Sequence, residues 1–480
     1  MELHPNFIRE NLDQIGRKEG LALLREWIDN SSNPILRQAA LKNFSLIEQG
    51  KNFKFFEQLF LSDEDLNMRI IAGEILKEKY SNNKKLIILL EYTLKKVDNV
   101  ELKLFAVKTL NSISNMRARI ILIDFLNDII KKEFKDKTNK FQKEIYTLNH
   151  KSTIPESFLE VCINLILNEY YTNECGYHVT LRKGKIISIN CESSQINSIS
   201  EIIQLISLNN LEHLYLQRNN LRKIDGFYFL KNLRTLDLSY NKIEKSENLE
   251  FLIKIEELNL SNNKIQKIEG IESLKNLRKL FINNNFIGEI EILSGLGNLE
   301  VLDLSHNQIS EIKNLDNLVK LNRLNLSFNQ IEKIKSLQTL KNLMWLYLNN
   351  NKISQIEGLL PFENLKGLYL SHNLIERIES LDNLINLKKL ELSNNKIRKF
   401  EGLQNLLELQ ELYLDNNNLT KLENLDNLHN LIMLHLGRNN ISEFRKEDIE
   451  NLHNLNFIFL NENPLDPQGF KDYHKRLKFP

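Results

Sequence analysis

The chain has 480 residues, with 64 Lys and Arg against 63 Asp and Glu and a formal net charge of +1, which argues against a general electrostatic affinity for nucleic acid or anionic membranes. A hydrophobic content of 42% argues against bulk disorder, and three cysteines are too few for a disulfide framework. No secretory signal and no apolar run long enough to span a bilayer is recognised, so we expect a cytoplasmic protein without membrane insertion.

Residues 1–150 lack the repeat described below, and their pattern predicts helices. Three segments resemble one another: NPILRQAALKNF, DLNMRIIAGEIL and NVELKLFAVKTL. Each contains a small residue preceded three positions earlier by a basic residue, namely Ala40 after Arg37, Ala72 after Arg69, and Ala106 after Lys103. This pattern resembles HEAT-type helical repeats, and a generic helical bundle fits the same residues.

Three helix starts can be placed in this region from capping residues. Asn33 before Pro34 predicts one start, with proline at the first helical position. Ser62 or Asp63 and then Asp98 predict two more. The polar residues 134–155 predict a joint between two modules.

Residues 151–196 are expected to hold a linker helix and the N-terminal cap of the next module. The helix is predicted around residues 156–171, and HVTLRKGKIISINCESSQI predicts a hairpin that turns at Lys183 and Gly184. Ile186, Ile189 and Ile196 then fit the repeat that follows only weakly.

A repeat dominates the rest of the chain. Apolar residues recur at intervals of 22, with a last interval of 24, at Leu211, Leu233, Ile255, Leu277, Leu299, Leu321, Leu343, Leu365, Leu387, Leu409, Leu431 and Leu455. An asparagine column follows the same spacing at Asn219, Asn241, Asn263, Asn285, Asn307, Asn329, Asn351, Asn373, Asn395, Asn417, Asn439 and Asn463. A divergent first unit has Ser194 in the asparagine position.

Each unit predicts a short strand followed by a tight return. Leu324 and Leu326 alternate with exposed residues, which is the period of a strand. An asparagine such as Asn329 offers both a donor and an acceptor to loop backbone groups that stacking would otherwise leave unpaired. No unit can bury its own leucines, so neighbouring units must stack to build a core.

Residues 184–466 resemble the leucine-rich-repeat family, and units such as NLRTLDLSYNKIEKSENLEFLIK are most similar to the subclass found in a regulatory subunit of protein phosphatase 1. Bacterial internalins share that repeat length, but the missing export signal argues against an internalin-like location. The resemblance implies an α/β solenoid, a right-handed horseshoe with strands on the concave face and short helical turns on the convex back. We assign about 12 units plus the divergent first one to residues 197–466, and a C-terminal cap to residues 467–480.

The concave face is the candidate binding surface, since in this family that face binds other proteins. Adjacent strands lie about 4.8 Å apart, so Trp345, Tyr347 and Tyr369 should form one aromatic cluster flanked by Arg323 and Lys389. Aromatic residues and arginine are enriched at interface hot spots. Two further side chains of the same column, Phe281 and Tyr413, complete the candidate partner-binding set. Gly367 is expected to leave space for a ligand side chain to rest on the indole of Trp345.

A second apolar group lies near the C-terminal end, formed by Met433, His435, Phe457 and Phe459. The favoured interpretation is that these residues cap the open end of the solenoid, and the alternative is a second contact area. The same columns mix Asp237, Glu257 and Glu391 with Lys279 and Arg323. A surface that tracks phosphates would instead be a basic stripe, so no nucleic-acid partner is expected.

No pattern that carries chemistry stands out. The sequence has no phosphate-binding glycine loop, no paired cysteine motif and no zinc-protease motif, so neither cofactor nor metal is predicted. Cys162, Cys175 and Cys191 are expected to be ordinary semi-buried thiols. Carboxylates such as Asp237 and Asp303 could in principle do acid–base chemistry, but a repeating strand face presents many by chance.

The sequence favours a non-enzymatic scaffold or adaptor that is monomeric alone and grips a folded partner protein. The resemblance makes a phosphatase catalytic subunit a candidate partner. An alternative is a regulator of a small GTPase or another nucleotide switch. A third hypothesis is a catalytic protein whose site lies in the helical module.

Overall fold

The computed structural model describes residues 3–133, 156–291, 293 and 295–476, which form two compact units. The helical unit comprises Met1–Gly176 with Leu181–Ile186, and the solenoid comprises Tyr177–Thr180 with Ile187–Pro480. The predicted joint at residues 134–155 lies outside the described residues. Among the described helices, none is both long and apolar enough to cross a membrane.

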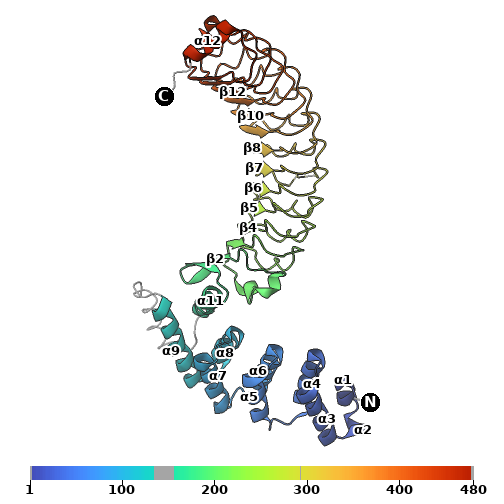
Figure 1. The fold of residues 1–480 in the computed structure, drawn as a ribbon. Coiled ribbons are helices and arrows are strands. Elements are labelled where there is room, and N and C mark those ends of the chain that lie inside the picture. The colour runs from blue at the N-terminus through green and yellow to red at the C-terminus, as the bar shows by residue number, and fades with distance from the viewer. Residues whose placement is uncertain (1–2, 134–155, 292, 294, 477–480) are drawn as a thin grey trace. The chain divides into compact units, whose positions relative to one another are not determined.

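The helical unit is a succession of short helices (Figure 1). Their bounds are α1 Pro5–Glu10, α2 Leu12–Ile15, α3 Arg17–Asn30, α4 Pro34–Ile47, α5 Phe53–Ser62, α6 Leu66–Tyr80, α7 Lys84–Lys96, α8 Val100–Ser112, α9 Met116–Glu133 and α11 Glu156–Asn173. The start at Asn33 is confirmed, because its side chain accepts two backbone N–H groups of α4. The other two starts are displaced along the chain: Asp65 caps α6 instead of Ser62 or Asp63, and Asn99 caps α8 instead of Asp98.

The basic residues of two of the three related segments tie helices into pairs. The Nε atom of Arg37 in α4 donates to the carbonyl of Ile28 at the end of α3, at 2.9 Å. Arg69 in α6 makes the same bond to Phe60 in α5, also at 2.9 Å. Each guanidinium therefore satisfies a carbonyl that the last turn of the preceding helix leaves open. The small residues Ala40, Ala72 and Ala106 are completely buried. This arrangement is consistent with HEAT-like helical repeats.

The solenoid presents one sheet, to which every coil contributes a short strand (Figure 1). The strands are β1 His178–Arg182, β2 Lys185–Asn190, β3 His213–Tyr215, β4 Thr235–Asp237, β5 Glu257–Asn259, β6 Lys279–Phe281, β7 Val301–Asp303, β8 Arg323–Asn325, β9 Trp345–Tyr347, β10 Gly367–Tyr369, β11 Lys389–Glu391, β12 Glu411–Tyr413, β13 Met433–His435 and β14 Phe457–Phe459. The strands line the concave side of the solenoid and the return segments form its convex back.

The strand register follows the sequence repeat. From β3 to β13 each residue pairs in parallel with the residue 22 positions later, as Leu346 does with Leu368. The last step, from β13 to β14, is 24 residues. At the other end β2 pairs in parallel with β3, so the divergent first unit contributes a strand of the same stack. The predicted hairpin is present between β1 and β2, where Lys183 and Gly184 both have positive φ.

The interior of the solenoid is filled by stacked leucines and isoleucines, and a row of asparagines hydrogen-bonds the backbone beside them. The repeat leucines and isoleucines are almost fully buried, for example Leu324 and Ile331 at 0% exposure. In a typical coil, Oδ1 of Asn329 accepts the backbone N–H of Ile309 at 3.0 Å. Its Nδ2 donates to the carbonyls of Leu304 and Leu326, at 3.1 and 3.0 Å. The asparagine thus links its own coil to the preceding one through otherwise unpaired backbone groups.

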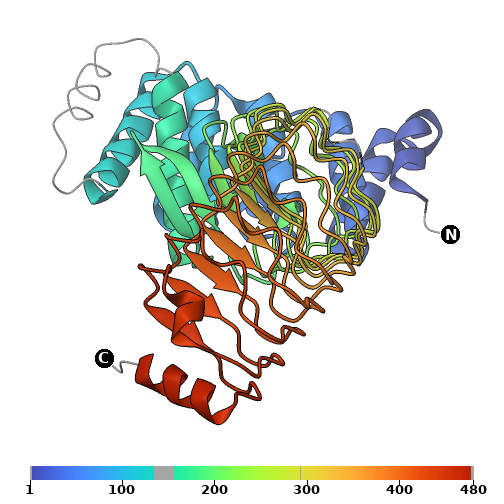
Figure 2. The same cartoon turned by 90° about the horizontal axis from the view of Figure 1, so that it is seen from above.

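The convex back is built from short turns. In most coils it consists of consecutive turns closed by hydrogen bonds three residues apart, such as the N–H of Leu340 to the carbonyl of Leu337 at 3.1 Å. Among the described residues, 3₁₀ helices occur at Ile199–Glu201, Leu205–Ser207 and Lys446–Ile449. The short turns expected on the convex back are therefore present, and at these three places they extend into 3₁₀ helices. Figure 2 shows the coils following nearly the same path over one another.

A C-terminal helix, α12 Pro467–Arg476, follows the last strand. Tyr473 of this helix is 9% exposed, and its hydroxyl accepts the N–H of Leu460 at 3.3 Å. Its ring meets the ring of Phe444 edge-on, at 6.4 Å between centroids. Because a solenoid must shield its terminal leucines, α12 serves as the cap at this end.

Candidate functional site on the concave face

The three-residue strands decide which side chains the concave face presents. The middle residue of each strand is a buried leucine or isoleucine, and the two flanking residues point out of the sheet. In β9 the buried residue is Leu346, with Trp345 and Tyr347 on either side. Parallel register then places the flanking residues of neighbouring strands next to one another, so each column of the sequence becomes a row on the surface.

Trp345, Tyr347 and Tyr369 lie together as one cluster across β9 and β10. The rings of Tyr347 and Tyr369 stack with centroids 4.3 Å apart and an interplanar angle of 16°. The indole of Trp345 lies 6.4 Å from the ring of Tyr369. All three side chains are half-buried among their neighbours. Burial raises the pKa of the Tyr369 phenol to about 12, so this hydroxyl stays protonated at neutral pH.

Two cations sit against these rings. The guanidinium of Arg323, in β8, lies 5.0 Å from the centroid of the Tyr347 ring. The ammonium of Lys389, in β11, lies 5.7 Å from the ring of Tyr369 and 4.7 Å from that of Tyr413 in β12. All three distances are within the range of cation–π attraction. The cations therefore help to hold the aromatic rings in place before any partner arrives.

Gly367 has a different role from the one expected. A Cβ atom at this position would come within 2.5 Å of Cε3 of Trp345 and within 2.9 Å of the ring of Tyr369. The indole of Trp345 thus occupies the space above the glycine, and Gly367 is itself buried. The expectation that Gly367 leaves a gap for a ligand side chain is wrong. The glycine instead lets Trp345 lie close to the sheet.

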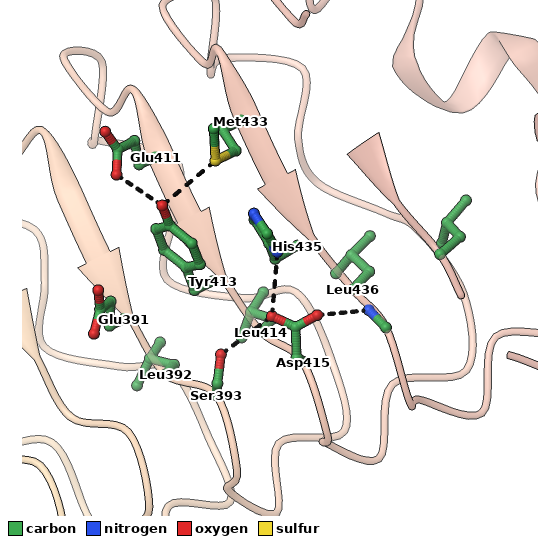
Figure 3. Close-up of polar contacts among 12 residues, drawn as sticks. Glu391, Leu392, Ser393, Glu411, Tyr413, Leu414, Asp415, Met433, His435 and Leu436 are labelled. Carbon is green, nitrogen blue, oxygen red and sulfur yellow. Dashed lines mark hydrogen bonds and ion pairs between the residues drawn. The ribbon is translucent and has the colours of Figure 1, made fainter. Parts of the chain in front are cut away.

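Lys389 is the centre of a charged network (Figure 3 shows its partners Glu391 and Glu411). Its Nζ atom lies 3.1 Å from Glu391 and 3.2 Å from Glu411. Burial lowers the pKa of the Lys389 ammonium, but the hydrogen bonds to the two carboxylates outweigh burial and raise that pKa above its ordinary value. Tyr413 donates its hydroxyl proton to Glu411 at 2.9 Å, and the same oxygen lies 3.4 Å from the sulfur of Met433.

The second apolar group continues the same row toward the C-terminus. His435 stacks between Tyr413 and Phe459, with centroids 4.5 and 4.3 Å away. Its Nδ1 atom lies 3.6 Å from a carboxylate oxygen of Asp415, as Figure 3 shows. Burial lowers the pKa of the His435 imidazole, although Asp415 opposes this, so the ring is mainly neutral at pH 7.

We call this continuous surface the aromatic row. It comprises Arg323, Trp345, Tyr347, Tyr369, Lys389, Tyr413, His435 and Phe459. The favoured interpretation of the second group as an end cap is wrong, since α12 shields that end and Phe457 is 49% exposed. The sequence contained the signal for continuity, because Tyr413 and His435 follow each other in one column and Lys389 lies on the strand before Tyr413.

Phe281 is not brought to the aromatic row. It lies on β6, and the two intervening strands present Asp303 and Asn325 at the same column position. Nδ2 of Asn325 donates to Asp303 at 3.1 Å, and Ser305 donates its backbone N–H to the other oxygen of Asp303 at 2.9 Å. Asp237 makes the equivalent bonds three coils earlier. These carboxylates therefore accept hydrogen bonds from the neighbouring strand and from the turn that follows their own strand.

Among the described residues, no group of three or more His, Cys, Asp and Glu side chains could hold a metal ion. Cys162 and Cys191 are buried and Cys175 is partly buried, all three as free thiols. Burial raises the pKa of the Cys175 thiol, which makes it a weak nucleophile at neutral pH.

A family model described as Leucine Rich repeats (2 copies) matches residues 209–251, 253–295, 297–342, 363–405 and 385–427. The solenoid is a leucine-rich-repeat domain. Its repeat region carries the leucine and asparagine columns on which the aromatic row is built. Comparison with curated proteins gives no match.

Solved structures share the fold of the leucine-rich-repeat domain. An internalin (inlF) from Listeria monocytogenes is 27% identical with a TM-score of 0.56, covering 61% of this chain and 85% of that one. TLR13 in its complex with ssRNA13 is also 27% identical with a TM-score of 0.52, covering 58% of this chain but only 44% of the TLR13 chain. The LRIM1/APL1C complex, at 22% identity and a TM-score of 0.52, shows the fold alone.

Proposed function

We propose that this chain is a non-enzymatic scaffold that grips a folded partner protein on the concave face of its leucine-rich-repeat domain. The observation that carries the proposal is the aromatic row. Its rings are stacked and flanked by cations, so they are held in place without a partner. Rigid aromatic anchors lose little conformational entropy on binding, and they dominate the energetics of most protein interfaces.

The contact residues we propose are Trp345, Tyr347, Tyr369, Arg323 and Lys389. Tyr413 extends the contact toward the C-terminus through Lys389. Phe281 would make a separate contact two coils before Arg323. The half-buried rings offer edges and hydroxyls to a partner, while the charged groups at the border select its orientation.

A protein partner fits this face better than a nucleic acid does. The cations Arg323 and Lys389 are separated by aromatic side chains. Lys389 is already paired with Glu391 and Glu411. A nucleic acid would require an uninterrupted basic surface along its phosphates. The RNA in the name of the TLR13 complex belongs to that protein.

Two narrower proposals concern the class of partner. A phosphatase catalytic subunit is suggested by the resemblance of the 22-residue units to a phosphatase regulator. A small GTPase or another nucleotide switch is the alternative, and it would be recognised by capture that depends on the bound nucleotide. The side chains on the concave face, and not the repeat length, determine which partner a repeat domain binds. The same capture experiment can therefore detect a partner of either class.

The test compares affinity capture from native lysate by the wild type and by a Trp345→Ala, Tyr347→Ala, Tyr369→Ala variant. Loss of several interface anchors typically costs about 2–4 kcal/mol each, enough to remove a partner from the capture. A matched control replaces three aromatic residues of the convex back, Tyr228, Phe229 and Phe251, which are 47, 39 and 48% exposed. Circular dichroism checks that both variants fold.

Selective loss of one protein with the concave variant, and its retention by the convex variant, is the expected result. Identical capture profiles from wild type and the folded concave variant would refute the proposal. If RNA rather than protein is lost selectively, a nucleic-acid function replaces the one proposed.

A further inference from the structure

A groove in the helical unit lies far along the chain from the aromatic row. It has a volume of about 740 Å³ and is formed by one face of α3, the N-terminal end of α4 and Leu3. From α3 it receives Glu19, Leu23, Glu26 and Trp27, which recur at helical spacing on one side of the helix. This volume lies in the range of ligand-binding clefts.

The groove combines apolar side chains with polar ones, and the polar lining residues are Glu19, Glu26, Asn30, Ser31, Ser32 and Asn33. Leu23, Trp27 and Leu36 are partly exposed in it, and Leu3 is 37% exposed. Nε1 of Trp27 donates to the carbonyl of Leu3 at 2.9 Å, which fixes the indole at the groove wall. Ile35, adjacent in sequence, is 75% exposed. Apolar side chains that are exposed singly need no explanation, whereas neighbouring ones that share a groove mark a candidate contact surface.

The charge of the groove points to a cationic occupant. Glu19 and Glu26 line it, and among the described lining residues none is Lys, Arg or His. Neither glutamate has an ion pair to another described residue. The arginines of α3 are held elsewhere, since Arg17 donates to the carbonyl of Ile47 and Arg25 pairs with Asp29 at 2.7 Å. An indole face beside two carboxylates is a favourable place for an ammonium or guanidinium.

An anion is disfavoured at the same place, although the N-terminus of α4 contributes to the wall. A helix start normally offers free N–H donors to anions. Here Oδ1 of Asn33 already accepts the N–H groups of Ile35 and Leu36, at 3.0 and 3.3 Å, and Pro34 has no N–H to give. The donors that would hold a phosphate or carboxylate are thus occupied.

We propose that this groove is a second docking site, which takes a basic amphipathic segment of another protein. Large apolar side chains of that segment lie on Leu23, Leu36 and Trp27. Its Lys or Arg side chains face Glu19 and Glu26. The site is independent of the concave face, so the chain would link two proteins.

The chain supplies its own probe for this site, since its two tryptophans are Trp27 and Trp345. In a full-length Trp345→Phe variant, emission comes from Trp27 alone. The titrant is a short amphipathic peptide of alternating lysine and leucine pairs. The control titrant has glutamate in place of lysine. We expect a saturable change of Trp27 emission with the lysine peptide only.

Removing the two charges tests the assignment of the site. In the same background, Glu19→Gln with Glu26→Gln should weaken binding of the lysine peptide by roughly tenfold, as expected for loss of two partly exposed ion pairs. The matched control is Glu74→Gln with Glu78→Gln, which removes two carboxylates from α6 of the same unit. This control should bind the lysine peptide as tightly as its parent.

Three results would overturn the proposal. The first is an equal response to the lysine and glutamate peptides. The second is equal weakening by the two pairs of glutamine substitutions, which would show a general charge effect. The third is a Trp27 emission that changes with protein concentration in the absence of peptide, which would assign the face to self-association.

Discussion

The asparagines of the repeated column, such as Asn329, are the residues on which the solenoid depends most. Each makes hydrogen bonds to buried backbone groups of two coils, so its removal leaves several donors and acceptors unpaired at once. Leaving one buried polar group without a partner costs about 1–3 kcal/mol, whereas the hydrogen bond itself contributes less to stability. The cost of losing such a side chain therefore comes mainly from the groups it leaves behind.

Neighbouring asparagines in one coil test this point. Asn417 accepts the N–H of Ile397 at 2.9 Å and donates to the carbonyls of Leu392 and Leu414. We predict that Asn417→Ala lowers the free energy of unfolding by about 3 kcal/mol. The exposed neighbour Asn418 is the control, and Asn418→Ala should change it by less than about 0.5 kcal/mol. In a Trp27→Phe background, urea unfolding monitored by the fluorescence emission of Trp345 gives the free energy of unfolding of both variants. Equal midpoints for the two variants would contradict the account.

At the scale of an element, the pair of strands β9 and β10 shows how neighbouring coils prepare the surface. A leucine in each strand anchors it to the core, and parallel register puts Gly367 beside Trp345. The strand geometry alone places positions 345 and 367 on the concave side. Because Gly367 has no side chain, the indole of Trp345 can lie close to the sheet at this position.

Gly367→Ala is expected to lift the indole of Trp345. The added Cβ would lie within 2.5 Å of the ring, so the ring must move, and overpacking of this kind costs about 1–3 kcal/mol. We predict a shift in Trp345 emission in a Trp27→Phe background, together with weaker capture of the partner. Gly288→Ala is the control, because no atom lies within 4 Å of a Cβ added there. Unchanged Trp345 emission in the Gly367→Ala variant would show that the glycine does not position the indole.

Part of this architecture could be predicted from the sequence and part could not, for physical reasons. Strand register follows from a fixed repeat, so the columns correctly placed Tyr369 beside Trp345 and Lys389. The repeat period does not specify side-chain rotamers, so it does not predict the contact between Gly367 and Trp345. It also does not tell which carboxylates a lysine selects, so the pairing of Lys389 with Glu391 and Glu411 appears only in the structure. The predicted helix caps precede the observed ones by one to three residues, because neighbouring polar side chains such as Asp98 and Asn99 can both cap a helix.

At the scale of the whole molecule, the chain joins a helical unit to a leucine-rich-repeat domain, and each carries one of the two tryptophans. Trp27 lies in the groove of the helical unit and Trp345 in the aromatic row. If both proposals hold, the two units bind different proteins, one by an acidic apolar groove and the other by preformed aromatic anchors. The chain would then act by bringing two partners close together.

The central claim is that a partner protein contacts the aromatic row, and site-specific photo-crosslinking tests it most directly. The full-length chain would carry benzoylphenylalanine in place of Tyr369 on the concave face or, as the matched control, in place of Phe251 on the convex back. After irradiation in native lysate, our account predicts one discrete protein adduct from position 369 that is absent from position 251. An adduct from position 251 alone, or the same adducts from both positions, would contradict it.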